Sequence, residues 1–263
     1  MAGSLRLYID VDGRRIEYRV ALPAGCQAQR RTMLVLLHEG LGSVSMWKDF
    51  PDLLAAATGR CVLAYSRYGH GASTGLGEPR RVDYMHREAL TALPQLLAGL
   101  NIERPVLIGH SDGASIAIIH AGGGHAVAGL VLLAPHVFVE EATIKGIAAA
   151  RRSFETAGLA ERLARYHDHP QTMFRGWNDV WLKPEFRDWN IEACVENISA
   201  PMLLIQSNTD PYGTLAQIDA IAQRARAPVV QSLLAGSSHS PHVDCREETI
   251  DAIKKFVDAL DVP

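Results

Sequence analysis

Residues 105–119 read PVLIGHSDGASIAII, two apolar runs joined by the sequence Gly-His-Ser-Asp-Gly. The first run predicts a buried β-strand, and the second predicts a helix. Gly109 and Gly113 lie two residues before and after Ser111 and lack a Cβ, so they allow the backbone to bend sharply there. The first N–H groups of the helix favour negative charge that develops nearby. The pattern predicts that Ser111 is a nucleophile at a strand-to-helix turn; a simple turn without catalytic function is the alternative.

Short apolar runs alternate with amphipathic stretches on both sides of this turn, after a hairpin predicted at Asp12-Gly13. The other predicted strands are TMLVLL (32–37), CVLAY (61–65), VAGLVLL (127–133), MLLIQ (202–206) and VVQSLL (229–234). The other predicted helices are SMWKDFPDLLAAA (45–57), YMHREALTALPQLLAGL (84–100), TLAQIDAIAQRA (214–225) and EETIDAIKKFVDAL (247–260). This alternation indicates an α/β fold with a mostly parallel sheet covered by helices on both faces.

The alternation stops between His136 and about Ala200. That stretch has no strand-like run, but it contains the helical sequence AAARRSFETAGLAERLARYH (148–167) and three of the four tryptophans. We therefore expect one core domain, formed by residues 1–136 and 199–263, with a helical insertion at 137–198.

A serine hydroxyl needs a base to take its proton, and the base needs a partner that orients it. Asp210 follows the strand MLLIQ, and His239 and His242 follow the strand VVQSLL. We favour His239 as the base, because it comes soon after the strand and a loop of small residues, and expect His242 to be a pocket or packing residue. Asp210 is the expected acid, although it is also a typical turn residue before Pro211, and Glu140 is the reserve candidate.

These segments resemble the α/β-hydrolase superfamily from about Leu5 to Leu260. The resemblance rests on HEGLGS (38–43), GHSDG (109–113), NTDPYG (208–213) and SSHSPH (237–242). The last of these is similar to the segment around the catalytic histidine of single-domain esterases, lactonases and carbon–carbon bond hydrolases, where His239 matches the base. The resemblance implies an eight-stranded, mostly parallel sheet with a helical cap.

The resemblance also implies an oxyanion hole made of two backbone N–H groups. Asp112, the residue after the serine, gives one, and Gly40 gives the other with Leu41 in reserve. The loop usually reads His-Gly-x, whereas this chain has His38-Glu39-Gly40. Glu39 is expected either to pair with Arg67, His38 or His70, or to position water or bind a donor group of the substrate.

Several other side chains are expected to face the pocket, although core packing is an equal alternative for each. They are His38, Tyr68, His110, His136, Trp177, Trp181 and Tyr212. Trp177 and Trp181 are four residues apart and therefore share one face of a helix. Glu39 and Asp112 together suggest an acidic entrance, which favours a neutral or cationic substrate with an apolar body.

The composition excludes several classes of protein. The 263 residues carry a formal net charge of −3, so no basic surface indicates nucleic acid or a membrane as a partner. The chain begins without a secretory signal pattern, and its four widely spaced cysteines suggest reduced thiols and a cytoplasmic protein. We expect no metal at His239 and His242, no dinucleotide at AGGGHA (121–126) and no other cofactor. The protein is expected to be a monomer or homodimer.

The sequence therefore predicts a serine hydrolase that cleaves a small-molecule ester or lactone through an acyl-enzyme. A carbon–carbon bond hydrolase of diketones and a thioesterase would use the same three residues and remain alternatives. A ligand-binding receptor on a hydrolase scaffold is the alternative from another class of protein.

Overall fold

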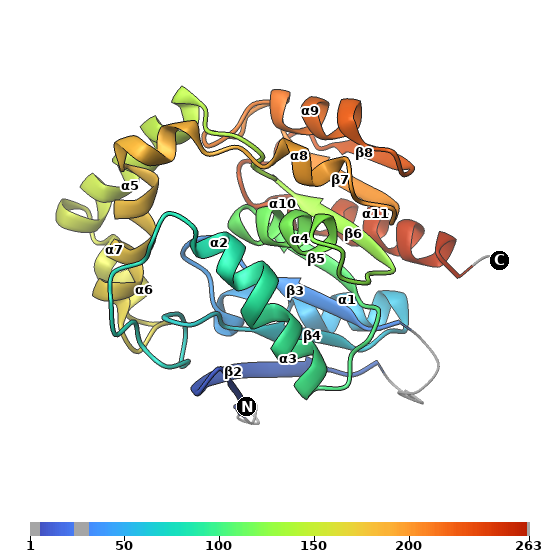
Figure 1. Ribbon diagram of the computed structural model, residues 1–263, viewed down its shortest axis with the longest axis horizontal. Coiled ribbons are helices and arrows are strands. Elements are labelled where there is room, and N and C mark those ends of the chain that lie inside the picture. Colours follow the sequence, from blue (N-terminus) through green and yellow to red (C-terminus); the bar gives the residue numbers. More distant parts are fainter. Residues whose placement is uncertain (1–5, 24–31, 262–263) are drawn as a thin grey trace.

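The computed structural model describes residues 6–23 and 32–261, which form one eight-stranded sheet between two layers of helices (Figure 1). The strands are β1 (Leu7–Val11), β2 (Arg14–Ala21), β3 (Leu34–Leu37), β4 (Val62–Tyr65), β5 (Val106–His110), β6 (Gly129–Leu133), β7 (Met202–Gln206) and β8 (Val229–Leu233). Their order across the sheet is β1-β2-β4-β3-β5-β6-β7-β8. β2 pairs antiparallel with β1 and β4, and every pair from β4 to β8 is parallel. The prediction of a mostly parallel, eight-stranded sheet is therefore confirmed.

The central strands are apolar along their whole length because both faces of the sheet are covered. In β3, Leu34 and Leu36 join one hydrophobic core, whereas Val35 and Leu37 join the other, as the alternation of side chains along a strand requires. All residues of β3 to β7 are buried. Because the central strands are packed on both faces, they give the loops that follow their carboxyl ends a fixed position.

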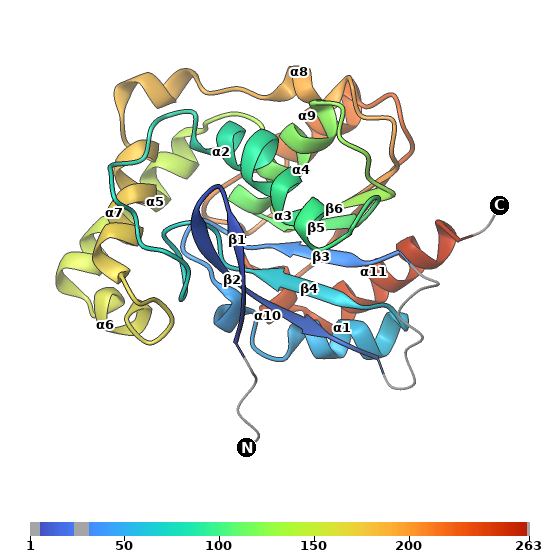
Figure 2. The ribbon, with the colours of Figure 1, turned by 60° about the horizontal axis from the view of Figure 1, so that its bottom comes forward.

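The helices of the core domain lie on both faces of the sheet (Figure 2). One face is covered by α1 (Phe50–Thr58) and α11 (Arg246–Ala259), and α10 (Pro241–Asp244) precedes α11. The other face is covered by α2 (Tyr84–Arg87), the π-helical turn η2 (Glu88–Ala92), α3 (Leu93–Gly99), α4 (Asp112–Gly122) and α9 (Ala216–Arg224). Within the described ranges, no helix is both long enough and apolar enough to span a bilayer.

The segment between β6 and β7 is helical, with an isolated bridge between Phe138 and Asn190 as its strand-like contact. Its helices are α5 (Glu141–Thr156), α6 (Leu159–Leu163), α7 (Pro170–Trp181), the 3₁₀ turn η3 (Pro184–Asp188) and α8 (Glu192–Val195). α5, α6 and α7 gather together beside the sheet, whereas α8 returns to pack on α4 and α9 (Figure 1). The boundaries 137–198 stay a prediction.

Two predicted helices differ in detail from the structure. The stretch 45–57 is divided into a 3₁₀ turn, η1 (Val44–Trp47), and α1, because Lys48 adopts a left-handed φ of 52° between them. The stretch 84–100 is continuous but widens into the π turn at Glu88–Ala92. The hairpin at Asp12-Gly13 is confirmed, and both residues have the positive φ that a tight two-residue turn requires. Cys194 and Cys245 are free thiols, and Cys26 lies outside the described residues.

Candidate active site

Ser111 lies at the sharp turn between β5 and α4, with a φ of 53° that few side-chain-bearing residues adopt. The turn is held by the N–H of Ser111, which donates to the carbonyl of Leu133 on β6 at 2.9 Å. A Cβ on Gly109 would lie 2.3 Å from the carbonyl oxygen of Gly113, and a Cβ on Gly113 would lie 2.0 Å from that of Leu37. The two glycines therefore permit a backbone crossing that alanine would obstruct.

His239 and Asp210 come together from the loops that follow β8 and β7. The Nδ1–H of His239 donates to the two carboxylate oxygens of Asp210 at 2.9 and 2.8 Å. The Asp210 side chain is fully buried, and its Oδ1 also accepts the N–H of Tyr212 at 2.8 Å. These contacts fix the carboxylate, and the carboxylate in turn orients the imidazole.

A cavity of about 330 Å³, the Ser111 pocket, lies between the core domain and the inserted helices. Its lining residues are Glu39, Gly40, Leu41, Met46, Ser111, Asp112, His136, Thr143, Ile147, Leu159, Leu163, Trp177, Trp181, Pro211, Tyr212, Ser238, His239 and Ser240. Ser111 and His239 thus open into the same space, with Asp210 behind His239. The volume lies in the range of small-molecule sites.

His242 occupies a different environment from His239. It packs against Trp47 and Phe50, with ring centroids 4.7 and 5.5 Å away, and lies outside the lining of the Ser111 pocket. Burial lowers the pKa of His242 to about 4, which keeps its ring neutral. Of the two histidines that the sequence offered, His239 has the carboxylate partner and His242 is a packing residue.

Gly40 and Asp112, the two expected oxyanion-hole residues, both line the Ser111 pocket, as does Leu41. Asp112 is the first residue of α4, so its N–H has no acceptor within the helix. Gly40 lies against the indole of Trp177: a Cβ on Gly40 would lie 2.0 Å from the indole Nε1. The two residues therefore lie at the pocket that Ser111 lines, and their role in an oxyanion hole stays a prediction.

The carboxylate of Asp112 is held inside the protein, contrary to the expected acidic entrance. Its Oδ2 accepts the hydroxyl of Tyr84 at 2.5 Å, and its Oδ1 accepts the indole N–H of Trp181 at 3.3 Å. The guanidinium of Arg67 lies 3.7 Å away, and both side chains are buried. Asp112 therefore contributes a balanced, structural charge, and the expectation that it makes the entrance acidic is wrong.

Glu39 has no ion pair among residues 6–23 and 32–261, so the expected pairing of its side chain is also wrong. Arg67 bonds the main-chain oxygen of Glu39 at 2.8 Å, and the Nδ1–H of His38 donates to the same oxygen at 2.7 Å. The carboxyl group lies against Gly42 and lines the pocket. Burial raises the pKa of Glu39, so this carboxyl group keeps its proton to a higher pH than an exposed glutamate does.

Four of the expected pocket residues, His136, Trp177, Trp181 and Tyr212, line the Ser111 pocket. Burial lowers the pKa of His136 to about 3, so this ring is a neutral polar group near His239. The ring of Tyr212 lies 4.6 Å from that of His239. The two tryptophans come from α7 and bring the inserted segment over the serine.

The other expected pocket residues lie elsewhere, because each is occupied by a structural contact. His38 is buried and accepts the N–H of Arg67 at 3.0 Å. His110 donates its Nε2–H to the carbonyl of His239 at 2.7 Å and thereby helps to hold the loop that follows β8.

Tyr68 lines a second pocket between the β1–β2 hairpin and the α2–η2 segment. We call this the Arg80 pocket; among its lining residues are Arg14, Tyr68, Arg80, Tyr84 and Glu88.

Glu140, the reserve acid, directly precedes α5, and its side chain contacts residues at the start of α9. Its carboxylate accepts the N–H and the hydroxyl of Thr214 at 2.9 and 2.7 Å, and the side-chain amide of Gln217 at 2.7 Å. His239 is not among its partners, and Asp210 has that contact instead.

Sequence reasoning missed several pocket residues and the support beneath the serine. The missed lining residues are Met46, Thr143, Ile147, Leu159, Leu163, Pro211, Ser238 and Ser240. The pairs Thr143–Ile147 and Leu159–Leu163 have the i, i+4 spacing of one helix face, which was the available signal. Nothing in the sequence indicated Tyr84, whose hydroxyl joins Asp112 to Trp181 at 3.1 Å. Within the described part of the chain, no cluster of metal-ligand side chains is present.

The comparisons with known proteins agree with this fold. The model of the alpha/beta hydrolase family matches residues 34–252. The proline iminopeptidase of Mycobacterium smegmatis is 19% identical, with 98% of this chain and 99% of that chain covered and a TM-score of 0.75. The enol-lactonase of Burkholderia xenovorans LB400 is 20% identical, with 97% and 99% covered and a TM-score of 0.70. Est816, described as an N-acyl homoserine lactone degrading enzyme, is 20% identical, with 95% and 100% covered and a TM-score of 0.69. No curated protein sequence matches the chain.

Proposed function

Because the chain belongs to the alpha/beta hydrolase family, we propose that it is a serine hydrolase that cleaves a small, neutral carboxylic ester or lactone. The observation that carries the proposal is that His239, which lines the same pocket as Ser111, contacts the buried carboxylate of Asp210. A nucleophile, a base and the base's orienting partner are the parts that acyl transfer requires.

In the proposed first step, the hydroxyl oxygen of Ser111 attacks the carbonyl carbon while the Nε2 of His239 takes the hydroxyl proton. Asp210 keeps the other ring proton on Nδ1, so Nε2 is the free basic nitrogen. The carbonyl oxygen becomes an oxyanion, which the N–H groups of Gly40 and Asp112 stabilise. One such donor is worth about 3 kcal/mol of barrier.

In the following steps, His239 returns its proton to the leaving alcohol oxygen, and the acyl group remains on Ser111. Water then gives a proton to His239 and attacks the acyl carbon. The bond from that carbon to the Ser111 oxygen breaks, His239 returns the proton to this oxygen, and the acid leaves. With a lactone, the leaving alcohol and the acid belong to one product molecule. No step needs a cofactor.

A neutral substrate suits the pocket better than an anionic one. No lysine or arginine is among the described residues that line the pocket, the charge of Asp112 is already balanced by Arg67, and burial raises the pKa of Glu39. Apolar side chains from the inserted helices, including Leu159 and Trp177, supply space for an apolar body. A hemisuccinate ester that outperforms neutral or amine-bearing esters of similar size would contradict this substrate class.

The test is a panel of purified wild type and Ser111→Ala against nitrophenyl esters, lactones, thioesters, diketones and prolyl nitroanilide. We expect steady multiple turnover of neutral esters or lactones by the wild type and its loss in Ser111→Ala. Turnover confined to diketones, thioesters or the nitroanilide would replace the ester and lactone assignment. A single slow burst with tight retention of product would favour a receptor instead.

A further inference from the structure

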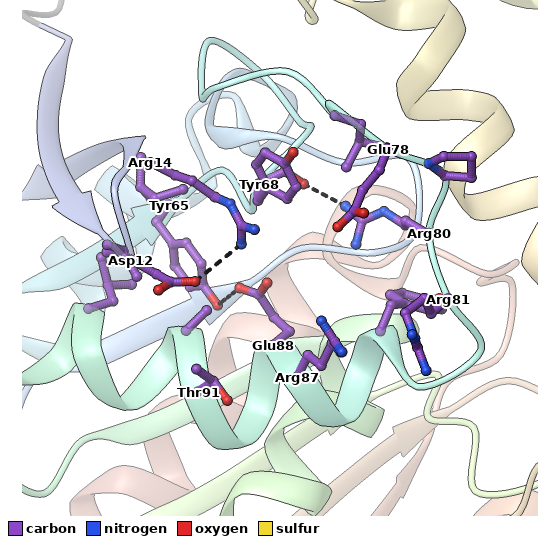
Figure 3. A pocket seen from close by; sticks show the side chains of 17 residues that line it. Asp12, Arg14, Tyr65, Tyr68, Glu78, Arg80, Arg81, Arg87, Glu88 and Thr91 are labelled. Atoms are coloured by element: carbon purple, nitrogen blue, oxygen red, sulfur yellow. Dashed lines mark hydrogen bonds and ion pairs between the residues drawn. The ribbon is translucent and has the colours of Figure 1, made fainter.

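The Arg80 pocket has a volume of about 350 Å³ and shares no lining residue with the Ser111 pocket. Figure 3 shows side chains from the β1–β2 hairpin, from the loop that follows β4 and from the α2–η2 segment converging on it. Tyr84 forms the wall between the two pockets: its ring lines the Arg80 pocket, and its hydroxyl bonds Asp112 in the Ser111 pocket.

Four arginines line the Arg80 pocket, and three of them already have a carboxylate partner. Arg14 lies 3.6 Å from Asp12, and Arg81 and Arg87 share Asp83 at 3.5 and 3.2 Å. These three arginines therefore already form ion pairs with carboxylates at the rim of the Arg80 pocket.

Arg80 is the exception. Its Nη2 donates to the carbonyl oxygen of Tyr68 at 2.5 Å, and its buried Nε has no hydrogen-bond partner. Within residues 6–23 and 32–261, no carboxylate forms an ion pair with it. The guanidinium also lies over the ring of Tyr84, 5.2 Å from the centroid, which fixes its position. A fixed, desolvated and unpaired guanidinium is a ready partner for one carboxylate.

Three carboxyl groups line the pocket, those of Asp12, Glu78 and Glu88, and none of them forms an ion pair with Arg80 within the described residues (Figure 3). Glu88 is the buried one. It is 7% exposed and lies at the start of the π turn η2, where its Oε1 accepts the hydroxyl of Tyr65 at 3.3 Å. Burial raises the pKa of Glu88, so this carboxyl group keeps its proton to a higher pH than an exposed glutamate does. π turns inside helices are frequent at functional sites.

The remaining walls are apolar and aromatic. Ile16, Leu76 and Leu96 line the pocket together with the rings of Tyr65 and Tyr84. A ligand that fits both Arg80 and these apolar walls has one anionic group and a compact apolar body, about the size of a benzoate ion.

We propose that the Arg80 pocket is a second small-molecule site, which binds a monoanionic organic acid with its carboxylate on Arg80 and its apolar body against Tyr65 and Leu96. The binding does not depend on the proposed hydrolytic function, because it uses none of the residues assigned to that reaction.

The test measures binding of 4-fluorobenzoate to the intact protein by ¹⁹F NMR, with 4-fluorobenzylamine as the cationic probe of the same shape. Two variants alter the Arg80 pocket: Arg80→Gln removes the charge, and Thr91→Trp fills the space from an exposed lining position. Two matched controls leave it intact: Leu159→Trp fills the Ser111 pocket, and Arg226→Gln removes an exposed arginine elsewhere.

We expect saturable binding of 4-fluorobenzoate to the wild type and to both controls. The affinity should be lower by about tenfold or more in Arg80→Gln, which loses one charge-assisted hydrogen bond, and in Thr91→Trp, which loses the space for the ligand. If Arg80→Gln fails to fold, Thr91→Trp still decides. Absence of saturable binding, preference for the benzylamine, or loss of binding in Leu159→Trp alone would each overturn the proposal. The last result would place the acid in the Ser111 pocket, and because no turnover is measured, failure here leaves the hydrolase proposal unaffected.

Discussion

The two pockets on either side of Tyr84 are built in different ways. The polar residues of the Ser111 pocket follow successive parallel strands, such as Ser111 after β5 and His239 after β8. The carboxyl ends of parallel strands lie at one edge of a sheet, so side chains that follow them are brought together by the topology. The Arg80 pocket is built from an antiparallel hairpin, a loop and a helix, and its central cation has no carboxylate partner within the described residues. The first site follows from the order of strands, and the second from packing at the sheet's border.

The largest expected effect is the loss of turnover in Ser111→Ala, which should lower kcat by about 10⁶-fold because the attacking oxygen is removed. The measurement is steady-state hydrolysis of the best ester or lactone from the panel. The same variant should bind 4-fluorobenzoate as tightly as the wild type, since the Arg80 pocket lies across Tyr84 from the serine. A variant that retains more than a hundredth of the activity would contradict the assigned nucleophile.

Asp210→Asn should lower kcat by about 10⁴-fold, because an amide in place of the carboxylate no longer fixes the proton on Nδ1 of His239. Glu140→Gln is the matched control, since Glu140 was the other candidate acid and bonds Thr214 and Gln217 instead. Its activity should stay within about threefold of the wild type. The opposite ranking of the two variants would exchange their roles.

The difference between the pockets also explains what the sequence could predict. Ser111 is flanked by glycines at the spacing that the turn requires, and Asp210 and His239 each follow a recognisable strand, so local pattern and chain order were sufficient to nominate them. The sheet was predictable for the same reason: its buried strands are continuous apolar runs.

Other features depend on contacts between residues far apart in the chain. Tyr84 reaches Asp112 and Trp181, and no periodicity in the sequence marks that contact. The carboxylate of Asp112 was expected at the entrance, but the same contact, together with Arg67, holds it inside. His38 and Tyr68 were expected in the Ser111 pocket because they follow strands, yet backbone partners hold them elsewhere. Where a strand ends shows which residues approach the site, whereas side-chain direction depends on the partners that surround it.

Tyr84→Phe tests the wall that the two pockets share. The change removes the hydroxyl that donates to Asp112 at 2.5 Å but keeps the ring that lines the Arg80 pocket. We expect kcat to fall by about tenfold, because α4 begins at Asp112 and loses one charge-assisted bond beside the oxyanion site, while KM changes little. The affinity for 4-fluorobenzoate should stay within about threefold. An unchanged kcat would show that the hydroxyl does not position Asp112.

Glu39→Gln has the smallest expected effect on turnover. Together with Glu88→Gln, it compares the buried carboxyl groups of the two pockets. Burial raises the pKa of Glu39 above its ordinary value of 4.5, so the folded protein holds this proton more tightly than the unfolded chain does. Its contribution to stability is therefore complete below pH 4.5 and is lost as the pH rises through the raised pKa. Glutamine removes the titration but keeps a hydrogen-bond donor, so the melting temperature of the variant relative to the wild type should increase from pH 5 to pH 9.

Activity should change in the same direction, because an ionised Glu39 beside Ser111 opposes the negative oxyanion. We expect kcat/KM of the wild type to decline relative to Glu39→Gln as the pH rises through the raised pKa of Glu39, and the two proteins to agree within about threefold below it. Glu88→Gln is the matched control: burial also raises the pKa of Glu88, so it should shift the melting temperature in the same sense, but it should leave the pH profile of turnover unchanged. If Glu88→Gln alters that profile as strongly as Glu39→Gln does, the two pockets are electrostatically one site, and the division at Tyr84 does not hold.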